Sequence, residues 1–245
     1  MVMLKLKWRV YKMNKSKITP TIIFIILLFG MSLFPYIPII IFKIDITKFS
    51  NTLKIMYEFA CDIGFMIIIY TLYYKKINED FKNYFKDFKH NFSVSFKYYI
   101  IGFIFMFLSN QIINIFFNNA VANNEEMVRS MIKMYPLYML FSVSIHAPFT
   151  EELIFRKSIK DAIYAFNKNR FTKYLYIFIS GLIFASLHVL GTSDSYIDYI
   201  YIIPYLSLGI AFAALYVKTD NIFSTIIMHS LHNTIAILLY IGLGV

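Results

Sequence analysis

The chain has very little charge, glycine, proline or cysteine for its length. Only 16% of its 245 residues are charged, and it holds 8 glycines and 6 prolines. A soluble domain carries about 25% charged residues, so this balance argues against a water-soluble fold. The single cysteine, Cys61, cannot form an internal disulfide, so covalent cross-links play no part in the expected structure.

Apolar and aromatic residues take the place of the missing charge. They make up 59% and 19% of the chain, and the mean hydropathy is +0.61. A membrane-spanning helix needs about 20 mostly apolar residues, and the sequence supplies such runs repeatedly. We therefore expect an all-α, polytopic transmembrane bundle of about seven to eight helices. The expected spans are residues 21–42, 55–74, 94–117, 135–149, 174–190, 199–217 and 222–244.

The net charge of +10 comes from lysines that lie beside the apolar runs and not in a nucleic-acid recognition motif. No nucleic-acid partner is therefore expected, and contact with membrane lipid explains the charge better. Residues 1–19, 75–97 and 157–173 are rich in lysine, whereas 118–129 and 191–198 are poor in basic residues. This asymmetry predicts a multi-pass protein of the cell membrane with a cytoplasmic N-terminus.

We expect one continuous membrane domain in two parts, an N-terminal part over 1–134 and a helical core over 135–245. Within the first part, residues 78–92 mix phenylalanine with lysine, which predicts a cytoplasmic amphipathic helix on the inner leaflet. A solvated loop is the alternative. Pro35 and Pro38 are expected to kink the outer half of the first span.

The stretch PFTEELIFRK, residues 148–157, places two adjacent acids and an arginine between apolar runs. On a helix Glu152 and Arg156 share a face, while Glu151 points about 100° away. The spacing therefore predicts one paired carboxylate, Glu152, and one free carboxylate, Glu151. In the plainer alternative, Thr150 caps a helix whose first turn holds both acids. Because ionisable groups beside membrane spans are costly, we favour a functional role.

Two further motifs contain histidine. Phe184 precedes His188 by one helical turn, and His229 precedes Asn233 by one turn. His232 is a possible alternative partner within the second motif. Any one of these histidines taken singly is more often a packed core residue, but together with the glutamates they suit a hydrolase that activates water.

A metal is compatible with these residues but is not required by them. The familiar pair of histidines around a glutamate on one helix is absent. A Zn²⁺ ion would have to be held by Glu151, His188 and His229 from three different spans. Straight helices would also leave His188 nearer the outer end of its span than the other two groups, at about 1.5 Å per residue.

Together, EELIFR (151–156), FASLH (184–188) and HSLHN (229–233) resemble, in order and spacing, the three motifs of the CPBP intramembrane protease family. This family includes CAAX prenyl endopeptidases and bacteriocin-processing or immunity proteins, also called Abi proteins. The resemblance covers residues 135–243. It implies an intramembrane active-site cavity and an endopeptidase that cleaves a membrane-associated or leader-type peptide, so the expected partners are membrane lipid and a peptide or protein substrate.

The resemblance also implies a role for each motif residue. Glu151 would be the general base that polarises the attacking water, with His188 assisting. Glu152 and Arg156 would set its position and charge. His229 and Asn233 would stabilise the oxyanion.

Two other functions remain open at the level of sequence. One is a non-catalytic bacteriocin-immunity or regulatory membrane protein that binds a peptide or a signalling partner. The other is a transporter whose glutamates and histidines carry protons. Against the transporter, the sequence shows neither an inverted repeat nor paired broken helices.

Overall fold

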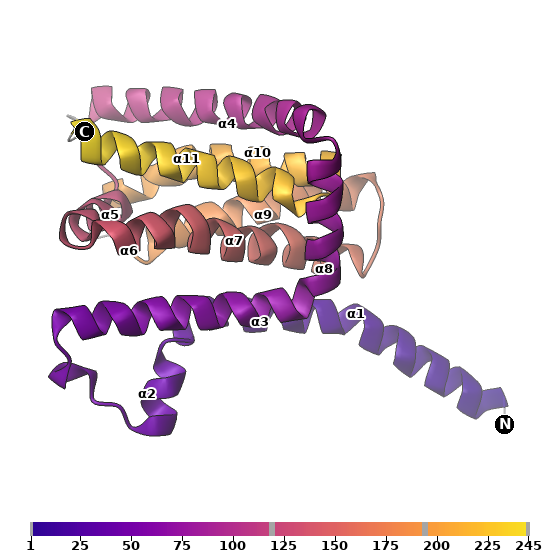
Figure 1. The fold of residues 1–245 in the computed structure, drawn as a ribbon. Helices are drawn as coiled ribbons and strands as arrows, with labels where there is room; N and C mark the ends of the chain where they lie inside the picture. Colours follow the sequence, from indigo (N-terminus) through magenta and orange to yellow (C-terminus); the bar gives the residue numbers. More distant parts are fainter. Residues whose placement is uncertain (1, 118–120, 193–195, 244–245) are drawn as a thin grey trace.

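The computed structural model describes residues 2–117, 121–192 and 196–243, and within these ranges the chain is helical without any strand. This confirms the all-α bundle (Figure 1). The long helices are α1 (Val2–Leu33), α3 (Asn51–Lys86), α4 (Phe88–Phe116), α9 (Arg170–Leu190), α10 (Ile202–Thr219) and α11 (Ile222–Leu243).

Shorter helices complete the chain. They are α2 (Tyr36–Phe42), α5 (Asn123–Met134), α6 (Pro136–Phe141), α7 (Ala147–Glu151) and α8 (Ile159–Tyr164), with two 3₁₀ turns, η1 (Ile46–Lys48) and η4 (Tyr196–Tyr201), and two π-helical stretches, η2 (Ser142–His146) and η3 (Glu152–Ser158). The run from α6 to α8 lies end to end along the bundle (Figure 1). It extends the span expected at 135–149 as far as Tyr164.

Five helices of the described ranges are long and apolar enough to cross a membrane. A sixth span results if the bent pair Lys17–Leu33 and Tyr36–Phe42 is one unit, whose halves meet at 74°. The break at Phe34 and Pro35 confirms the kink expected in the outer half of the first span. Together with the rod from α6 to α8, these elements form a multi-pass membrane protein.

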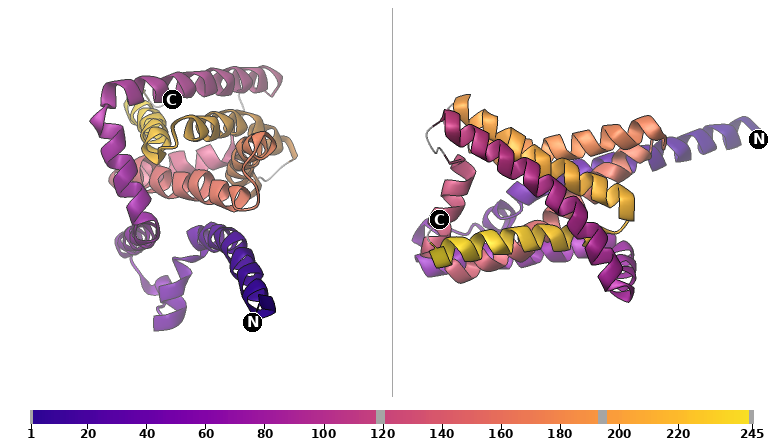
Figure 2. Two further views of the ribbon diagram at one scale, coloured as in Figure 1. Left: turned by 90° about the vertical axis from the view of Figure 1, so that its right-hand side faces the viewer. Right: turned by 90° about the horizontal axis from the view of Figure 1, so that it is seen from above.

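Helix α3 bends sharply after its apolar part. Tyr73 leaves the helical region, with φ −112° and ψ 16°, and the following turns run across the direction of the other long helices (Figures 1 and 2). This segment is amphipathic, because Ile77 and Tyr84 are buried while Phe81 and Lys82 are exposed. The helix expected over residues 78–92 is thus confirmed, and it is formed by the end of α3 and the start of α4. Its placement on the inner leaflet stays a prediction.

The transverse part of α3 is fastened to the start of α11. The buried Asp80 accepts a hydrogen bond from the backbone N–H of Ile222 at 2.9 Å, and its carbonyl accepts one from the Asn221 amide at 2.8 Å. Lys76 lies 3.0 Å from the other oxygen of Asp80. Because a free N–H at a helix start needs an acceptor, Asp80 serves as a cap from another element.

The hydrophobic core joins both halves of the chain. Its largest cluster packs Leu27 of α1 and Phe65 of α3 against Leu153 and Phe155 of η3 and Tyr216 of α10. Residues 1–134 and 135–245 therefore pack around one shared core. The boundary at residue 134 stays a prediction.

Helices α9 and α10 approach each other through glycines. A β-carbon added to Gly181 would lie 2.9 Å from the backbone nitrogen of Ile210 and 3.1 Å from the carbonyl carbon of Gly209. Small residues let helix backbones pack this closely in a membrane. The contact matters for the site because α9 also carries the second histidine motif.

We expect Gly181→Ala to lower the free energy of unfolding by about 1 to 3 kcal/mol, because the new methyl group meets backbone that cannot move aside. The matched control is Gly242→Ala, where nothing lies within 4 Å of the added carbon; its effect should stay within about 0.5 kcal/mol. Thermal unfolding in detergent can be followed with a thiol-reactive dye, because Cys61 is buried. Equal unfolding temperatures for the two variants would contradict the close crossing.

Candidate active site

The first motif lies inside one helical rod and not at a helix start. The rod passes from η2 through α7 into η3, so Glu151 ends an α-helical stretch and Glu152 begins a π-helical one. The hydroxyl of Thr150 donates to the carbonyl of His146 at 2.8 Å, within the rod. The alternative in which Thr150 caps the helix is therefore wrong. π-helical turns are rare and often mark functional sites, and here two flank Pro148, which has no N–H to give.

Glu152 and Arg156 form a fully buried ion pair. Both side chains have no exposed surface, and Arg156 Nε donates to Glu152 Oε2 at 2.9 Å. Arg156 Nη1 donates to the hydroxyl of Ser180 on α9 at 2.9 Å, and that hydroxyl donates to the carbonyl of Phe155 at 2.7 Å. The guanidinium also lies over the Phe184 ring, 4.8 Å from its centroid. The predicted pairing of Glu152 with Arg156 is confirmed.

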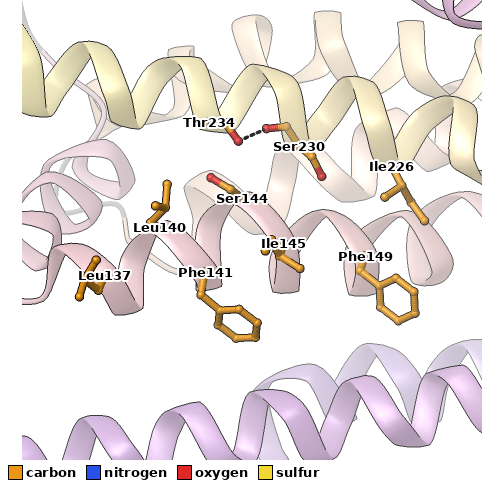
Figure 3. A pocket seen from close by; sticks show the side chains of 9 residues that line it. All are labelled: Leu137, Leu140, Phe141, Ser144, Ile145, Phe149, Ile226, Ser230 and Thr234. Atoms are coloured by element: carbon orange, nitrogen blue, oxygen red, sulfur yellow. Dashed lines mark hydrogen bonds between the residues drawn. The ribbon is translucent and has the colours of Figure 1, made fainter.

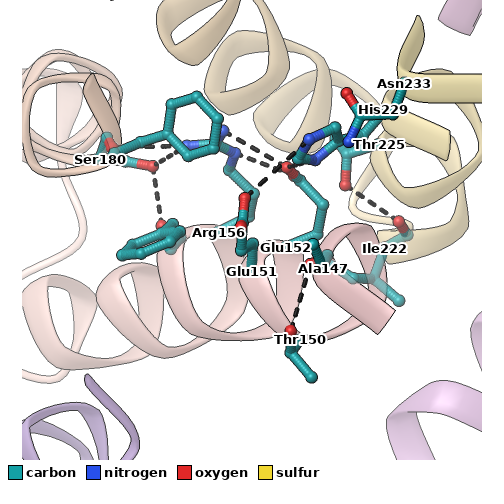
Figure 4. A network of polar contacts seen from close by, with 12 residues as sticks. Ala147, Thr150, Glu151, Glu152, Arg156, Ser180, Ile222, Thr225, His229 and Asn233 are labelled. Atoms are coloured by element: carbon teal, nitrogen blue, oxygen red, sulfur yellow. Dashed lines mark hydrogen bonds and ion pairs between the residues drawn. The ribbon is translucent and has the colours of Figure 1, made fainter. Parts of the chain in front are cut away.

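His229 of α11 connects this ion pair to the second glutamate (Figure 4). Its Nδ1 lies 3.0 Å from Glu152 Oε1, and its Nε2 lies 3.9 Å from Glu151 Oε2. A carboxylate can only accept, so Nδ1 carries the proton in the first contact. Glu152 thereby fixes the tautomer of His229 and turns Nε2 toward Glu151.

Glu151 faces a cavity of about 460 Å³. Its Oε2 is buried and has no hydrogen-bond partner among the described residues. The cavity is also lined by His188, His229 and Asn233, so all three motifs reach one chamber, hereafter the chamber. An unpartnered carboxylate oxygen beside a histidine nitrogen is the arrangement that a general base needs.

His188 lines the chamber, and contacts with two aromatic rings hold its imidazole in place. It contacts the Phe184 ring with the centroids 4.4 Å apart, as its spacing predicts, and the Tyr205 ring of α10 at 4.8 Å, both in tilted arrangements. Its Nδ1 lies 2.9 Å from the Phe184 carbonyl, so Nδ1 donates and Nε2 is left as an acceptor. Phe184 also contacts His229, with centroids 5.8 Å apart. His188 thus shares the chamber although it lies nearer the end of its helix.

Asn233 and His232 each contact a different neighbouring helix. The Asn233 amide donates to the carbonyl of Val143 in η2 at 2.8 Å, which joins α11 to the rod that carries the glutamates. The second N–H of the amide remains available. His232 also lines the chamber, and its Nδ1 lies 3.3 Å from the Tyr99 hydroxyl of α4.

The donor types fit zinc, but their arrangement does not. Within the described part of the chain, no three His, Cys, Asp or Glu side chains come close enough to hold a metal ion. The Phe184 ring contacts both His188 and His229, the two histidines of the expected set. A Zn²⁺ site made of Glu151, His188 and His229 stays a prediction.

Sequence reasoning missed two groups of polar residues. Ser180, which holds Arg156, precedes Phe184 and His188 at intervals of four, so the helical period of α9 could have revealed it. The second group surrounds Asp62 of α3, which accepts hydrogen bonds from Tyr138 and Ser142 at 3.2 and 3.3 Å and lies 3.5 Å from His146 Nδ1.

A second, apolar groove of about 570 Å³ lies on the other side of the rod. Phe141, Ile145 and Phe149 line it from the rod, and Ile226 and Ser230 line it from α11 (Figure 3). Of the residues in the three motifs only Ser230 borders this groove, and none of the six candidate site residues does. The rod and α11 therefore separate this apolar groove from the chamber that the candidate site residues line.

Known protein families and proteins match the part of the chain that carries the site. Residues 133–235 match the family described as type II CAAX prenyl endopeptidase Rce1-like. The chain is 31% identical over 118 residues to the putative membrane peptidase YdiL of Bacillus subtilis, covering 48% of this chain and 43% of that protein.

Two further relatives are similar over a somewhat longer stretch. The membrane-embedded CAAX protease MroQ of Staphylococcus aureus is 28% identical over 141 residues, covering 55% of this chain and 53% of that protein. The UPF0177 protein YvdC of Lactococcus lactis is 28% identical over 149 residues, covering 57% and 53%. The chain spans about half the length of the curated relatives it matches.

No solved structure matches the chain. The three motifs that meet at the chamber, at 151–156, 184–188 and 229–233, all lie inside the matched segment. The resemblance to the CPBP family, which includes the CAAX proteases, is thus confirmed for this segment of the chain.

Proposed function

We propose that this protein is an intramembrane endopeptidase that hydrolyses a peptide bond with water activated by Glu151. The observation that carries the proposal is the series of contacts from Arg156 through Glu152 to His229, whose Nε2 faces the chamber 3.9 Å from the unpartnered Oε2 of Glu151. The names of two relatives, a putative membrane peptidase and a CAAX protease, support the same class of reaction and do not favour a non-catalytic regulator.

In the first step, water lies between the Glu151 carboxylate and the substrate carbonyl. Glu151 removes a proton from the water as the water oxygen bonds to the carbonyl carbon. The lone pair on His188 Nε2 is placed to accept the other water hydrogen and so to orient the nucleophile. In the second step, the carbon–nitrogen bond breaks and the protonated Glu151 returns its proton to the leaving amine.

The oxyanion of the tetrahedral intermediate needs donors that are already in position. The second N–H of Asn233 is one candidate. His229 supplies another when it is protonated, because Glu152 already occupies Nδ1 and leaves Nε2–H to face the chamber. The carboxylate of Glu152 also stabilises that imidazolium, as a third group does in other catalytic arrays.

Glu152, Arg156 and Ser180 are positioning residues in this mechanism. They do not border the chamber, and they act by fixing His229. Arg156 offsets the charge of Glu152, so that the buried carboxylate can remain ionised and accept from His229.

We expect Glu151→Gln to lower the cleavage rate at least about 100-fold, because an amide cannot take the proton of water. The assay uses purified protein in lipid nanodiscs with a peptide pool made by digesting a bacterial proteome, and mass spectrometry counts the new termini. The matched control, Glu126→Gln, changes an exposed acid outside the chamber and should leave the rate unchanged. Full activity in Glu151→Gln at unchanged abundance would remove Glu151 as the base.

We expect Glu152→Gln to destabilise the protein by about 3 to 5 kcal/mol, because it leaves the buried Arg156 charge unpaired. The double variant Glu152→Gln with Arg156→Met removes both charges and should regain much of the lost stability. Its cleavage rate should nevertheless stay low, because His229 has lost the acceptor that orients it.

The two readouts for these variants are the unfolding temperature and the cleavage rate of the same peptide pool. A double variant that is both stable and fully active would show that the ion pair has no role in positioning His229. A single variant as stable as the wild-type protein would contradict the buried ion pair itself.

A further inference from the structure

The two ends of the helical bundle differ in charge. At one end lie the transverse part of α3, α8 and the α10–α11 turn (Figure 1), and these segments carry Lys75, Lys76, Lys82, Lys86, Lys160 and Lys218. The opposite end, where α2 and α5 lie, carries Lys43, Lys48, Lys54, Arg129 and Lys133. Because basic residues beside membrane spans stay in the cytoplasm, this difference orients the bundle with the α8 end inside.

The chamber extends toward the opposite, less basic end. Beyond the motif residues, its lining comes from α5, the beginning of α10 and the later part of α11, including Asn124, Arg129, Tyr205 and Tyr240. Glu125 and Arg129 of α5 form an ion pair at 2.6 Å, and their side chains are 49% and 34% exposed. These charged, partly exposed groups mark where the chamber meets water.

The chamber is closed toward the basic end by the largest hydrophobic cluster. This cluster shares Phe184 with the chamber lining, and its members Phe155, Tyr176, Tyr216 and Ile222 are each at most 1% exposed and do not line the chamber. The buried ion pair of Glu152 and Arg156 lies on this closed side. A peptide could reach Glu151 from the α8 end only by unpacking this core.

Building on the proposed function, we propose that the chamber is filled from the outer side of the membrane, so that the substrate is an extended peptide segment exposed on that side. The chamber volume of about 460 Å³ lies within the range of small-ligand pockets, so it accommodates a short stretch of chain and not a folded domain. Polar groups at the mouth suit the main chain of such a segment, and aromatic rings deeper in suit its apolar side chains.

The test uses single-cysteine variants made in a Cys61→Ala background, embedded in right-side-out and inside-out membrane vesicles. The probe is a membrane-impermeant trimethylammonium thiosulfonate reagent, which reacts with thiolates in water. Glu125→Cys reports on the mouth, Ala147→Cys on the chamber wall beside Glu151, and Lys168→Cys on the basic end.

We expect Glu125→Cys and Ala147→Cys to react in right-side-out vesicles, and Lys168→Cys only in inside-out vesicles. Ile145→Cys is the matched control for Ala147→Cys, because it lies two residues away on the same rod but lines the apolar groove (Figure 3). Ala147→Cys should react at least about tenfold faster than this control, since a thiol that faces an apolar groove forms little thiolate.

Three outcomes would overturn the proposal. Reaction of Ala147→Cys mainly in inside-out vesicles would show that the chamber fills from the cytoplasm. Exchange of the Glu125→Cys and Lys168→Cys patterns would reverse the orientation. Equal, slow reaction at Ala147 and Ile145 would show that no aqueous path exists. Labelling requires no catalysis, so these outcomes are distinct from a failure of the peptidase proposal, which the Glu151→Gln assay detects by itself.

Discussion

The structure depends on a complete ion pair in a place without water. Glu152 and Arg156 are both fully buried, and the cost of removing two charges from water is offset only if every polar atom finds a partner. Ser180 and the Phe184 ring complete the surroundings of Arg156, and His229 completes those of Glu152. Each partner comes from another helix, so the requirement to satisfy one charge pair fixes η3, α9 and α11 relative to one another.

The same requirement separates two adjacent glutamates into different roles. Glu152 turns inward, where its oxygens are occupied by Arg156 and His229. Glu151 lies about 100° around the helix and faces the chamber with one buried oxygen unpartnered. Because the two glutamates are adjacent on the helix, their side chains point in different directions. Glu152 is therefore bound to Arg156 and His229, whereas Glu151 keeps an unpartnered oxygen at the chamber. The paired carboxylate also orients the histidine next to the free one.

The sequence predicted the parts of this site that depend on local spacing. A separation of four residues paired Glu152 with Arg156 and Phe184 with His188, and both contacts are present. The kink at Pro35 likewise follows from the ring of proline and its missing N–H. These predictions hold because helical geometry alone fixes which side chains meet.

Other features could not be predicted, because they depend on how helices pack. The helical rod continues past Pro148 through two π-helical stretches, so the alternative of a helix start at Thr150, which Pro148 had made plausible, is wrong. The spacing also gave no sign of the close approach of α9 and α10 at Gly181, and straight-helix counting did not indicate that His188 and Glu151 line one chamber. Neither π-helical geometry nor a glycine contact leaves a periodic signal that identifies its partner.

The position of Asn233 limits how a substrate can bind. One of its amide hydrogens is committed to the carbonyl of Val143, which keeps α11 against the rod and the polar chamber apart from the apolar groove. Only the other hydrogen can meet an oxyanion, so in the proposed mechanism the scissile carbonyl must lie on the chamber side of that contact, within reach of His229 Nε2. Glu151 lies across from the same nitrogen at 3.9 Å, so the base and the oxyanion donors converge on one narrow region of the chamber wall. A peptide bond that enters the chamber without reaching this wall would be bound but not hydrolysed, because the water and the oxyanion must be held at the same carbon.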